Sequence, residues 1–338
     1  MTRIAILGGG SWGTALSVVL SRTRKPHEIS LWVHNAALAE SLHLHRENTA
    51  YLPGVSLPAS IRVTHDYAEA LAGARIVVGA MPSVHARAIY SQALPHLGPE
   101  TIFVSATKGL EPATRLRMSR LIAQLLTQAT SATFSQSIAV LSGPSFAAET
   151  ARNEPTAVVV ASQEAGLATK LQEEFASPSL RLYSNDDVLG VELAGAMKNV
   201  IAIAAGVCQG IGLGSNSLAA LITRGLAEMS RLAVALGGHA ETLSGLAGLG
   251  DLVLTCNGTL SRNRHVGVEL GKGRSLAEIL ANMRMIAEGV DTAAPLLELA
   301  REQNIELPIT EQVDAILRSG KSPREAIRDI MERPLKKE

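Results

Sequence analysis

Short runs of apolar residues alternate with longer helical patterns over about the first 185 residues of the chain. Runs of β-branched and aliphatic residues predict eight strands, at residues 3–8, 29–33, 61–64, 75–80, 101–106, 138–142, 156–161 and 180–184. The runs are continuously apolar rather than alternating, which is typical of parallel strands covered by helices on both faces. The pattern predicts an α/β fold with a doubly wound parallel sheet.

The strand pattern stops after the segment YSNDDVLG at residues 183–190. From Val191 onward nearly every segment has helical periodicity, interrupted by glycine-rich turns such as GIGLGSNS and GLAGLGD. We therefore expect a doubly wound α/β domain over residues 1–190 and an all-helical domain over residues 191–338.

Composition and charge narrow the class of protein. A chain of 338 residues suits two domains, and its 46% apolar and 18% charged residues indicate a folded protein rather than a disordered one. Basic and acidic residues both number 31, so no net charge favours binding to nucleic acid or to anionic lipid. The ten aromatic residues are few for a surface that stacks on nucleic-acid bases.

The two cysteines and the start of the chain indicate a cytoplasmic protein. Cys208 and Cys256 have no metal-binding spacing, so we interpret them as free thiols in a reducing compartment. The first residues enter an apolar strand without the pattern of a secretion signal. His43 and His45 lack a third ligand in the sequence, and we expect no metal site.

The uncharged stretch at residues 199–223 is long enough to be considered as a membrane span. It contains several polar residues and four glycines, however, so we expect a buried helix followed by a glycine-rich turn.

The segment IAILGGGSWGTALSVVL places Gly8, Gly10 and Gly13 in G-x-G-x-x-G spacing between a strand and an apolar helix. In that context the glycines permit a tight turn and the approach of a pyrophosphate to the helix N-terminus, which predicts binding of NAD or NADP. The acidic residue expected at the end of the second strand is replaced by His34 and Asn35. Because no carboxylate repels it, a 2′-phosphate is tolerated there, and NADP is slightly favoured over NAD. The alternative is that His34 is only an exposed loop residue and the cofactor selectivity is low.

Lys198 lies in the middle of the apolar segment AGAMKNVIAIAAG, where Glu192 is the only other charged residue between Asp187 and Arg224. Burial of an unpaired ammonium costs several kcal/mol, so the lysine must find a carboxylate partner, shift its pKa or snorkel to the surface. Its neighbours at helical spacing are small or apolar, which favours a buried catalytic lysine that acts as a general acid or base.

Polar residues in four further segments are candidates for the same site. Asp251 follows a glycine-rich run and either meets a helix or merely caps the next one. Ser261, Arg262 and Asn263 form a polar loop suited to a phosphate dianion. The segments SATKGLEP (residues 105–112) and LSGPSFAAE (residues 141–149) follow predicted strands, where open α/β sheets bind ligands.

Seven separated motifs resemble those of the bacterial NAD(P)-dependent glycerol-3-phosphate dehydrogenases over nearly the whole chain. They are GGGSWGTALS, ATKGLE, SGPSFAAE, ELAGAMKNVIAIAAG, GLAGLGDLVLTC, SRN and AEGV. The resemblance implies a Rossmann-type domain followed by a helical domain like that of 6-phosphogluconate dehydrogenase. It implies reversible hydride transfer between carbon 2 of sn-glycerol 3-phosphate and the nicotinamide. The ketone formed from the alcohol is dihydroxyacetone phosphate. It also implies a homodimer, and a role in supplying glycerol 3-phosphate for phospholipid synthesis.

The resemblance also assigns residues by motif, with Lys198 as the proton donor or acceptor at the substrate oxygen. The implied substrate-binding residues are Lys108, Gly143, Ser145, Lys198, Asp251, Ser261, Arg262 and Asn263. The implied cofactor-binding residues are Gly8, Gly10, Ser11, Trp12, Gly13, His34, Lys108, Ala147, Arg262, Ile286 and Glu288. Two positions depart from the family pattern, since His34 stands where arginine is common and Ile286 stands where valine is expected.

Two other functions fit part of the sequence. A β-hydroxyacid dehydrogenase also combines a Rossmann domain, a helical domain and a catalytic lysine, but its carboxylate substrate does not need the phosphate-binding segment at residues 261–263. A non-catalytic redox sensor needs the glycine loop but has no use for a lysine in an apolar helix.

Overall fold

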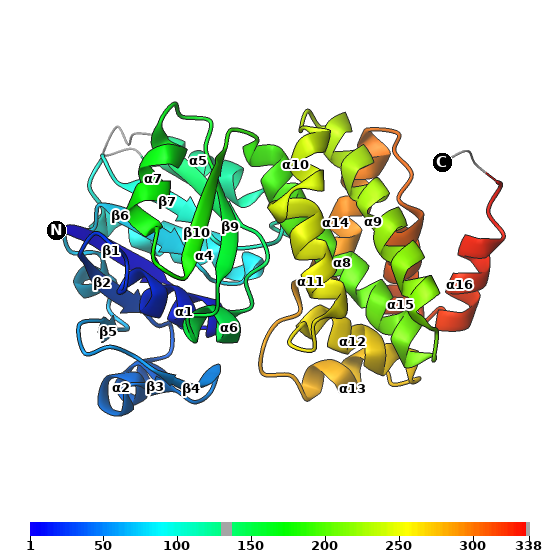
Figure 1. Ribbon diagram of the computed structural model, residues 1–338, viewed down its shortest axis with the longest axis horizontal. Helices are drawn as coiled ribbons and strands as arrows, with labels where there is room; N and C mark the ends of the chain where they lie inside the picture. The colour runs from blue at the N-terminus through cyan, green and yellow to red at the C-terminus, as the bar shows by residue number, and fades with distance from the viewer. Residues whose placement is uncertain (130–136, 336–338) are drawn as a thin grey trace. The chain divides into compact units, whose positions relative to one another are not determined.

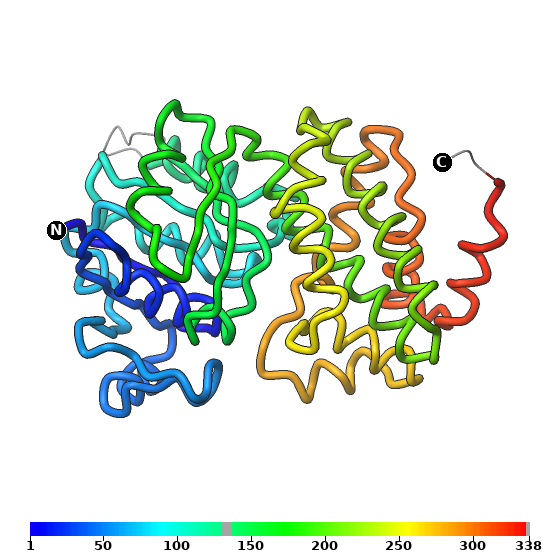
Figure 2. Tube along the Cα trace, in the orientation of Figure 1, coloured from blue at the N-terminus to red at the C-terminus, as the bar shows by residue number. Residues whose placement is uncertain are grey.

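The computed structural model describes residues 1–129 and 137–335, and the chain divides into two compact units, Met1–Glu192 and Leu193–Glu338. The first unit contains the β-sheet, and the described residues of the second contain helices and no strand (Figure 1). The change occurs in the green part of the chain trace in Figure 2. The observed architecture is the Rossmann-type unit followed by the all-helical unit that the hydrophobic pattern predicts.

All eight predicted strands are present, each within two residues of the predicted bounds. They form one sheet in the order β10-β9-β8-β7-β6-β1-β2-β5. A separate two-stranded sheet, β3 with β4, has no counterpart in the prediction. The strands are β1 (Thr2–Leu7), β2 (His27–Trp32), β3 (Glu47–Asn48), β4 (Leu52–Ser56), β5 (Arg62–Thr64), β6 (Ile76–Gly79), β7 (Ile102–Ser105), β8 (Ile138–Ser142), β9 (Thr156–Ala161) and β10 (Leu180–Asn185).

The prediction of an entirely parallel sheet is wrong at one pair, because β8 and β9 are antiparallel. The only helix between them is α6 (Ala147–Ala151), whose five residues span about 8 Å at the helical rise of 1.5 Å per residue. A strand of five residues spans about 16 Å, so α6 runs along only about half the length of β8 and does not form a full crossover helix. The chain therefore re-enters the sheet from the edge at which β8 ended.

Helices cover both faces of the large sheet because alternate residues of its strands point to opposite sides. Val78 of β6 belongs to the core shared with α1 and α7, whereas Val77 belongs to the core shared with α4 and α5. The helices of the first unit are α1 (Ser11–Leu20), α2 (Ala36–His45), α3 (Tyr67–Leu71), α4 (Ser83–Ala93), the 3₁₀ turn η1 (Leu94–His96), α5 (Met118–Gln128), α6 and α7 (Leu167–Phe175).

The long helix α8 (Val188–Gly210) begins in the first unit and continues into the second. It is long and apolar enough to be considered as a membrane span, but 94% of its most hydrophobic 18-residue window is buried inside the protein. Its acidic residue, Glu192, accepts hydrogen bonds from the backbone N–H of Ser119 at 2.7 Å and from Arg117 Nη1 at 2.6 Å. Glu192 thus caps the N-terminus of α5, which has no side-chain cap of its own.

The remaining helices complete the second unit. A buried carboxylate joins two of them, since Glu228 of α9 accepts hydrogen bonds from the backbone N–H of Ile309 at 2.5 Å and of Thr310 at 3.3 Å, at the start of α15. These helices are α9 (Ser215–Ala235), α10 (Ala240–Ser244), the π-helical turn η2 (Leu246–Gly250), α11 (Asp251–Asn257), α12 (Arg262–Gly271), α13 (Leu276–Ala281), α14 (Glu288–Glu302), α15 (Pro308–Ser319) and α16 (Pro323–Met331).

Candidate active site

The glycine loop joins the carboxyl end of β1 to the start of α1, at the point where the strand order reverses. Gly8 has a φ of +129°, and a Cβ atom there would lie 2.8 Å from the carbonyl oxygen of Ala80. At Gly13 a Cβ atom would lie 1.8 Å from the carbonyl oxygen of Gly8. Gly10 has open space where its side chain would stand. The loop is therefore close-packed on the protein side and accessible at Gly10, which fits the approach of a pyrophosphate.

Three other predicted cofactor residues lie near the glycine loop in the sequence: Ser11, Trp12 and His34. Ser11 and Trp12 open α1, and the indole Nε1 of Trp12 is buried without a hydrogen-bond partner among the described residues. His34 is exposed just beyond β2, with its ring centroid 6.0 Å from that of Trp32. Asn35 caps α2 by accepting a hydrogen bond from the Leu38 N–H at 2.8 Å. Neither His34 nor Asn35 is a carboxylate that would repel a 2′-phosphate.

Lys108, Gly143 and Ser145 come together at the carboxyl ends of β7 and β8, which are neighbouring parallel strands. Lys108 Nζ donates a hydrogen bond to the Gly143 carbonyl oxygen at 2.8 Å and lies 3.4 Å from Ser145 Oγ. Gly143 has a φ of +132°, and Ala147 is the first residue of α6 a few positions later. The arrangement holds an ammonium group beside a hydroxyl at the ligand-binding edge of the sheet.

Lys198 is 6% exposed, so the alternative in which it snorkels to the surface is wrong. Its Nζ lies 2.9 Å from Asp251 Oδ1 and donates a hydrogen bond to Thr255 Oγ1 at 2.8 Å. Asp251 is 1% exposed and is the first residue of α11, whose N-cap is Gly250, so the alternative in which Asp251 merely caps this helix is also wrong. A buried ammonium is thus paired with a buried carboxylate, as burial of either charge requires.

The glycine-rich run before Asp251 determines where that carboxylate stands. It forms the π-helical turn η2, in which a Cβ atom at Gly248 would lie 2.0 Å from the carbonyl oxygen of Leu243. This close packing leads directly into α11, whose first residue is Asp251. Thr255 lies one turn further along the same face and donates a hydrogen bond to the Asp251 carbonyl oxygen at 2.6 Å. Its hydroxyl is then oriented to accept from Lys198.

Ser261, Arg262 and Asn263 do not form the polar loop that we predicted, because they are the N-cap and first residues of α12. Asn263 is buried, donates to Asn199 Oδ1 at 2.9 Å and accepts from the Gly289 N–H at 2.9 Å. It therefore links α8, α12 and the start of α14.

Arg262 differs from its neighbours, since it is half-buried and its guanidinium makes no hydrogen bond to a protein group in residues 1–129 and 137–335. Burial lowers the pKa of its guanidinium, and nearby Glu288 partly opposes that shift. A half-buried guanidinium with unused donors at a helix N-terminus suits an anionic ligand. Glu288 begins α14, and Ile286 lies two residues before it.

The structure also identifies polar residues that the sequence analysis missed. Thr255 has a detectable signal, because it lies four residues after Asp251 and so shares its helix face. Asn199 directly follows Lys198 and is an amide in an otherwise apolar helix. No sequence pattern connects Asn199 with Asn263, since their hydrogen bond joins residues 64 positions apart.

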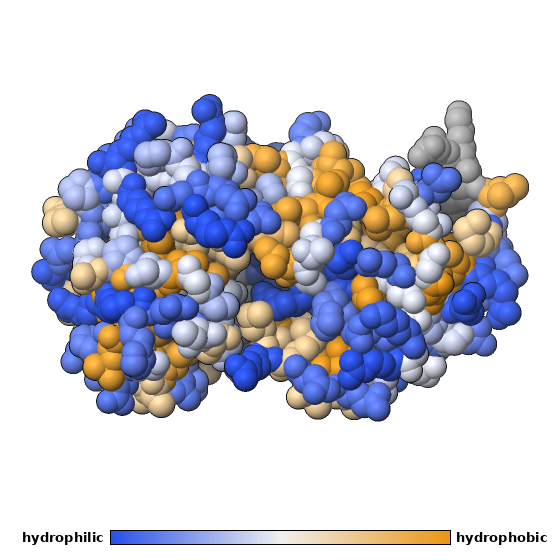
Figure 3. All heavy atoms as spheres, turned by 60° about the horizontal axis from the view of Figure 1, so that its bottom comes forward, coloured by the Kyte–Doolittle hydropathy of each residue, from blue (hydrophilic) through white to orange (hydrophobic). Residues whose placement is uncertain are grey.

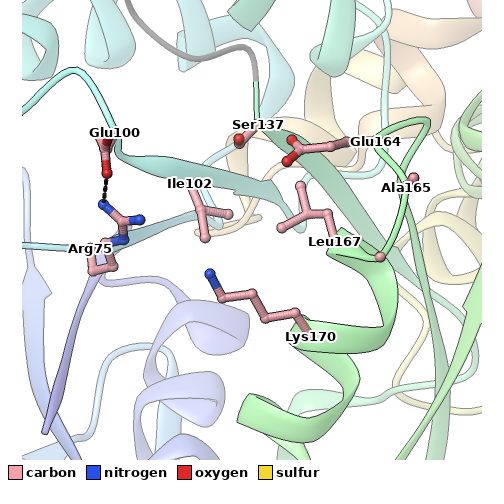
Figure 4. A pocket seen from close by; sticks show the side chains of 9 residues that line it. Arg75, Glu100, Ile102, Ser137, Glu164, Ala165, Leu167 and Lys170 are labelled. Carbon is pink, nitrogen blue, oxygen red and sulfur yellow. Dashed lines mark hydrogen bonds and ion pairs between the residues drawn. The ribbon is translucent and has the colours of Figure 1, made fainter.

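A separate cavity of about 430 Å³ lies in the first unit (Figure 4). Arg75 and Glu100 come just before β6 and β7, so the cavity lies at the amino edge of these strands, opposite to the glycine loop. Glu164 and Lys170 also line it, and the Arg75 to Glu100 ion pair measures 2.8 Å. With two charges of each sign, the cavity has no excess positive charge for a phosphate ligand.

Both parts of the chain match models of one protein family. A model described as the N-terminus of NAD-dependent glycerol-3-phosphate dehydrogenase matches residues 3–168, and the corresponding C-terminal model matches residues 187–328. Glycerol-3-phosphate dehydrogenase [NAD(P)+] of Koribacter versatilis is 54% identical over 335 residues, covering 99% of this chain and 98% of the relative. The corresponding protein of Acidobacterium capsulatum is 53% identical over 338 residues, covering 99% of both chains.

A solved structure supports the same relationship. The crystal structure of glycerol-3-phosphate dehydrogenase from Coxiella burnetii superposes with a TM-score of 0.91 at 39% sequence identity. It covers 98% of this chain and 99% of the Coxiella chain.

Proposed function

The chain belongs to the NAD-dependent glycerol-3-phosphate dehydrogenase family, and on that premise we propose that Lys198 is its general acid and base. The protein is an oxidoreductase that interconverts sn-glycerol 3-phosphate and dihydroxyacetone phosphate with NAD or NADP. When bound, the nicotinamide accepts the hydride from carbon 2 of the alcohol or supplies it to the ketone.

The buried group of Lys198, Asp251 and Thr255 is the observation that carries the assignment. In the reducing direction negative charge grows on the oxygen at carbon 2, and a cationic Lys198 stabilises that charge and donates the proton. Asp251, 2.9 Å from the ammonium nitrogen, offsets the free-energy cost of removing that charge from water. Thr255, at 2.8 Å, restricts the direction of the N–H bonds of the ammonium. In the oxidising direction the same amine accepts the proton.

The substrate phosphate is bound in our proposal by Arg262, with Ser261 and Asn263 beside it. Arg262 has guanidinium donors that no protein group uses among the described residues, and phosphate oxygens are its natural acceptors. Binding the phosphate away from the reacting carbon positions that carbon, so that this binding energy contributes to the rate. Lys108, Gly143 and Ser145 are proposed to complete the substrate-binding set.

The nicotinamide cofactor is bound in our proposal through the glycine loop. Gly8, Gly10 and Gly13 would hold its pyrophosphate, and the first turn of α1 would provide N–H donors to it. The missing carboxylate after β2 supports acceptance of NADPH, with His34 available to the 2′-phosphate. The other proposed contacts follow the family motifs and are Ser11, Trp12, Lys108, Ala147, Arg262, Ile286 and Glu288.

We also propose a homodimer that works in the cytoplasm and supplies glycerol 3-phosphate for phospholipid synthesis. The helical unit exposes large apolar side chains, among them Val234 at 49%, Val253 at 41% and Leu260 at 50%. Hydrophobic surface is visible over this unit in Figure 3, and a second copy of the chain is the partner that would bury it. Cys208 and Cys256 are buried free thiols, which suits a reducing compartment.

The experiment that tests the reaction mixes the pure protein with dihydroxyacetone phosphate and either NADH or NADPH, and follows the absorbance of the reduced cofactor. We expect oxidation of the cofactor, and the relative rates give the cofactor preference. Binding of NADH without its consumption would support a redox sensor instead. Turnover of a β-hydroxyacid but not of the phosphorylated ketone would support the other dehydrogenase class.

A further inference from the structure

Asn48, a fully buried residue of the short strand β3, makes direct contact with the glycine loop. Its Nδ2 donates one hydrogen bond to the carbonyl oxygen of Gly9 at 2.9 Å and another to Thr14 Oγ1 at 2.8 Å. Its Oδ1 accepts a hydrogen bond from the Tyr51 N–H at 3.2 Å, which fixes the orientation of the amide. Both amide hydrogens and the amide oxygen are therefore in use.

The bond to Gly9 determines the direction of the next N–H group. All peptide bonds in the described chain are trans, and in a planar trans peptide the C=O and N–H bonds point in opposite directions. Because Asn48 holds the Gly9 carbonyl toward the protein interior, the Gly10 N–H points away from Asn48. That N–H has no acceptor within residues 1–129 and 137–335, and the side-chain position of Gly10 is open.

We propose that Asn48 is a positioning residue for the cofactor, which fixes the Gly9–Gly10 peptide so that the Gly10 N–H is directed at the pyrophosphate. The second arm of Asn48, to Thr14, ties the loop to the first turn of α1, whose unpaired N–H groups face the same anion. Because these donors are already oriented in the free protein, cofactor binding does not have to order the glycine loop. The conformational-entropy cost avoided is large, since glycine loses more conformational entropy on ordering than any other residue. The inference rests on the proposed role of the glycine loop.

The test compares Asn48→Ala with Thr14→Val, by titrating each purified full-length variant with NADPH, ADP-ribose and adenosine 2′-phosphate. Asn48→Ala removes both arms, whereas Thr14→Val removes only the arm to α1 and leaves the Gly9 bond in place. For Asn48→Ala we expect the Kd of NADPH and of ADP-ribose to rise about tenfold, the effect of one lost hydrogen bond to a charged group. The Kd of adenosine 2′-phosphate, which has no pyrophosphate, should change less than twofold.

Thr14→Val should leave all three Kd values within about threefold of the wild type. At saturating NADPH, the kcat of Asn48→Ala for dihydroxyacetone phosphate should stay within about twofold. If Asn48→Ala does not fold, Asn48→Ser takes its place, since a hydroxyl refills part of the space and donates to one acceptor only, and at least a threefold rise in Kd is expected.

Two results would overturn the proposal. Unchanged Kd values for NADPH and ADP-ribose in a folded Asn48 variant would show that the amide supports the fold alone. An equal loss for adenosine 2′-phosphate would show a general disturbance of the first unit. Failure of the proposed enzymatic function is distinguishable from both, because the wild-type protein would then bind NADPH without reducing dihydroxyacetone phosphate.

Discussion

Replacement of Lys198 by methionine tests the catalytic assignment most directly. Methionine keeps much of the length of the side chain in this apolar helix but removes the ammonium group. The substitution deletes the ionic contact with Asp251 at 2.9 Å and the hydrogen bond to Thr255 at 2.8 Å. It therefore affects the reaction and the stability of the fold at the same time, and the two effects have to be measured separately.

The structure sets the size of both effects. Loss of a general acid lowers kcat by about 10²- to 10⁴-fold, which corresponds to about 3–5 kcal/mol of transition-state stabilisation. Since Asp251 is 1% exposed, the single variant leaves a carboxylate buried without its cationic partner, and breaking such a pair lowers the free energy of unfolding by about 3–5 kcal/mol. Adding Asp251→Asn removes the stranded charge, so the double variant should recover about 2 kcal/mol of stability as coupling energy. It should recover no activity.

The assays are steady-state kinetics with dihydroxyacetone phosphate, fluorescence titration with NADPH, and denaturant unfolding of the single and double variants. The Kd of NADPH should stay within about threefold, because the glycine loop belongs to the other unit. Turnover of Lys198→Met near that of the wild type would remove Lys198 from the mechanism. Strictly additive stability losses in the double variant would refute the buried pairing with Asp251.

Three further predictions concern other parts of the chain. Arg262→Ala should raise the KM for dihydroxyacetone phosphate by about tenfold to a hundredfold, with a smaller effect on kcat, because the charged hydrogen bonds to the phosphate are lost; an unchanged KM in steady-state assays contradicts the phosphate role. Gly13→Ala forces a Cβ atom against the Gly8 carbonyl, so fluorescence titration should show a more than tenfold weaker binding of NADPH, whereas the control Gly98→Ala, which meets no atom within 4 Å, should bind normally. Burial raises the pKa of Glu228 from 4.5 to about 7, so the folded state holds this proton more tightly than the unfolded state does, and stability should fall by roughly 3 kcal/mol as the pH rises from about 4.5 to 7. In denaturant unfolding of Glu228→Gln, the free energy of unfolding should change by about that much less between these two pH values. If its pH dependence equals that of the wild type, Glu228 is not the source of the effect.

Much of the fold could be predicted because its signals are local. The eight strands follow from continuous apolar runs, and the helical half follows from periodicity that is visible within a few turns. The glycine spacing is equally local, since a side chain at Gly13 would meet the Gly8 carbonyl oxygen five residues earlier, although the space at Gly8 is limited by the distant residue Ala80. The sequence also indicates Lys198 as a site residue, because a charge in an apolar helix requires a compensating partner, whichever part of the chain supplies it.

The identity of the partners was decided only by tertiary packing. For Asp251 the spacing alone favours a capping role over contact with a helix. Nothing in the spacing of Lys198 and Thr255, 57 residues apart, indicates that their side chains meet. The same holds for Asn48, which contacts Gly9 from 39 residues away, and for the antiparallel insertion of β9. Periodicity records which face of an element is buried, but a hydrogen bond depends on the distance and angle between two atoms, and these are fixed only when distant elements pack against one another.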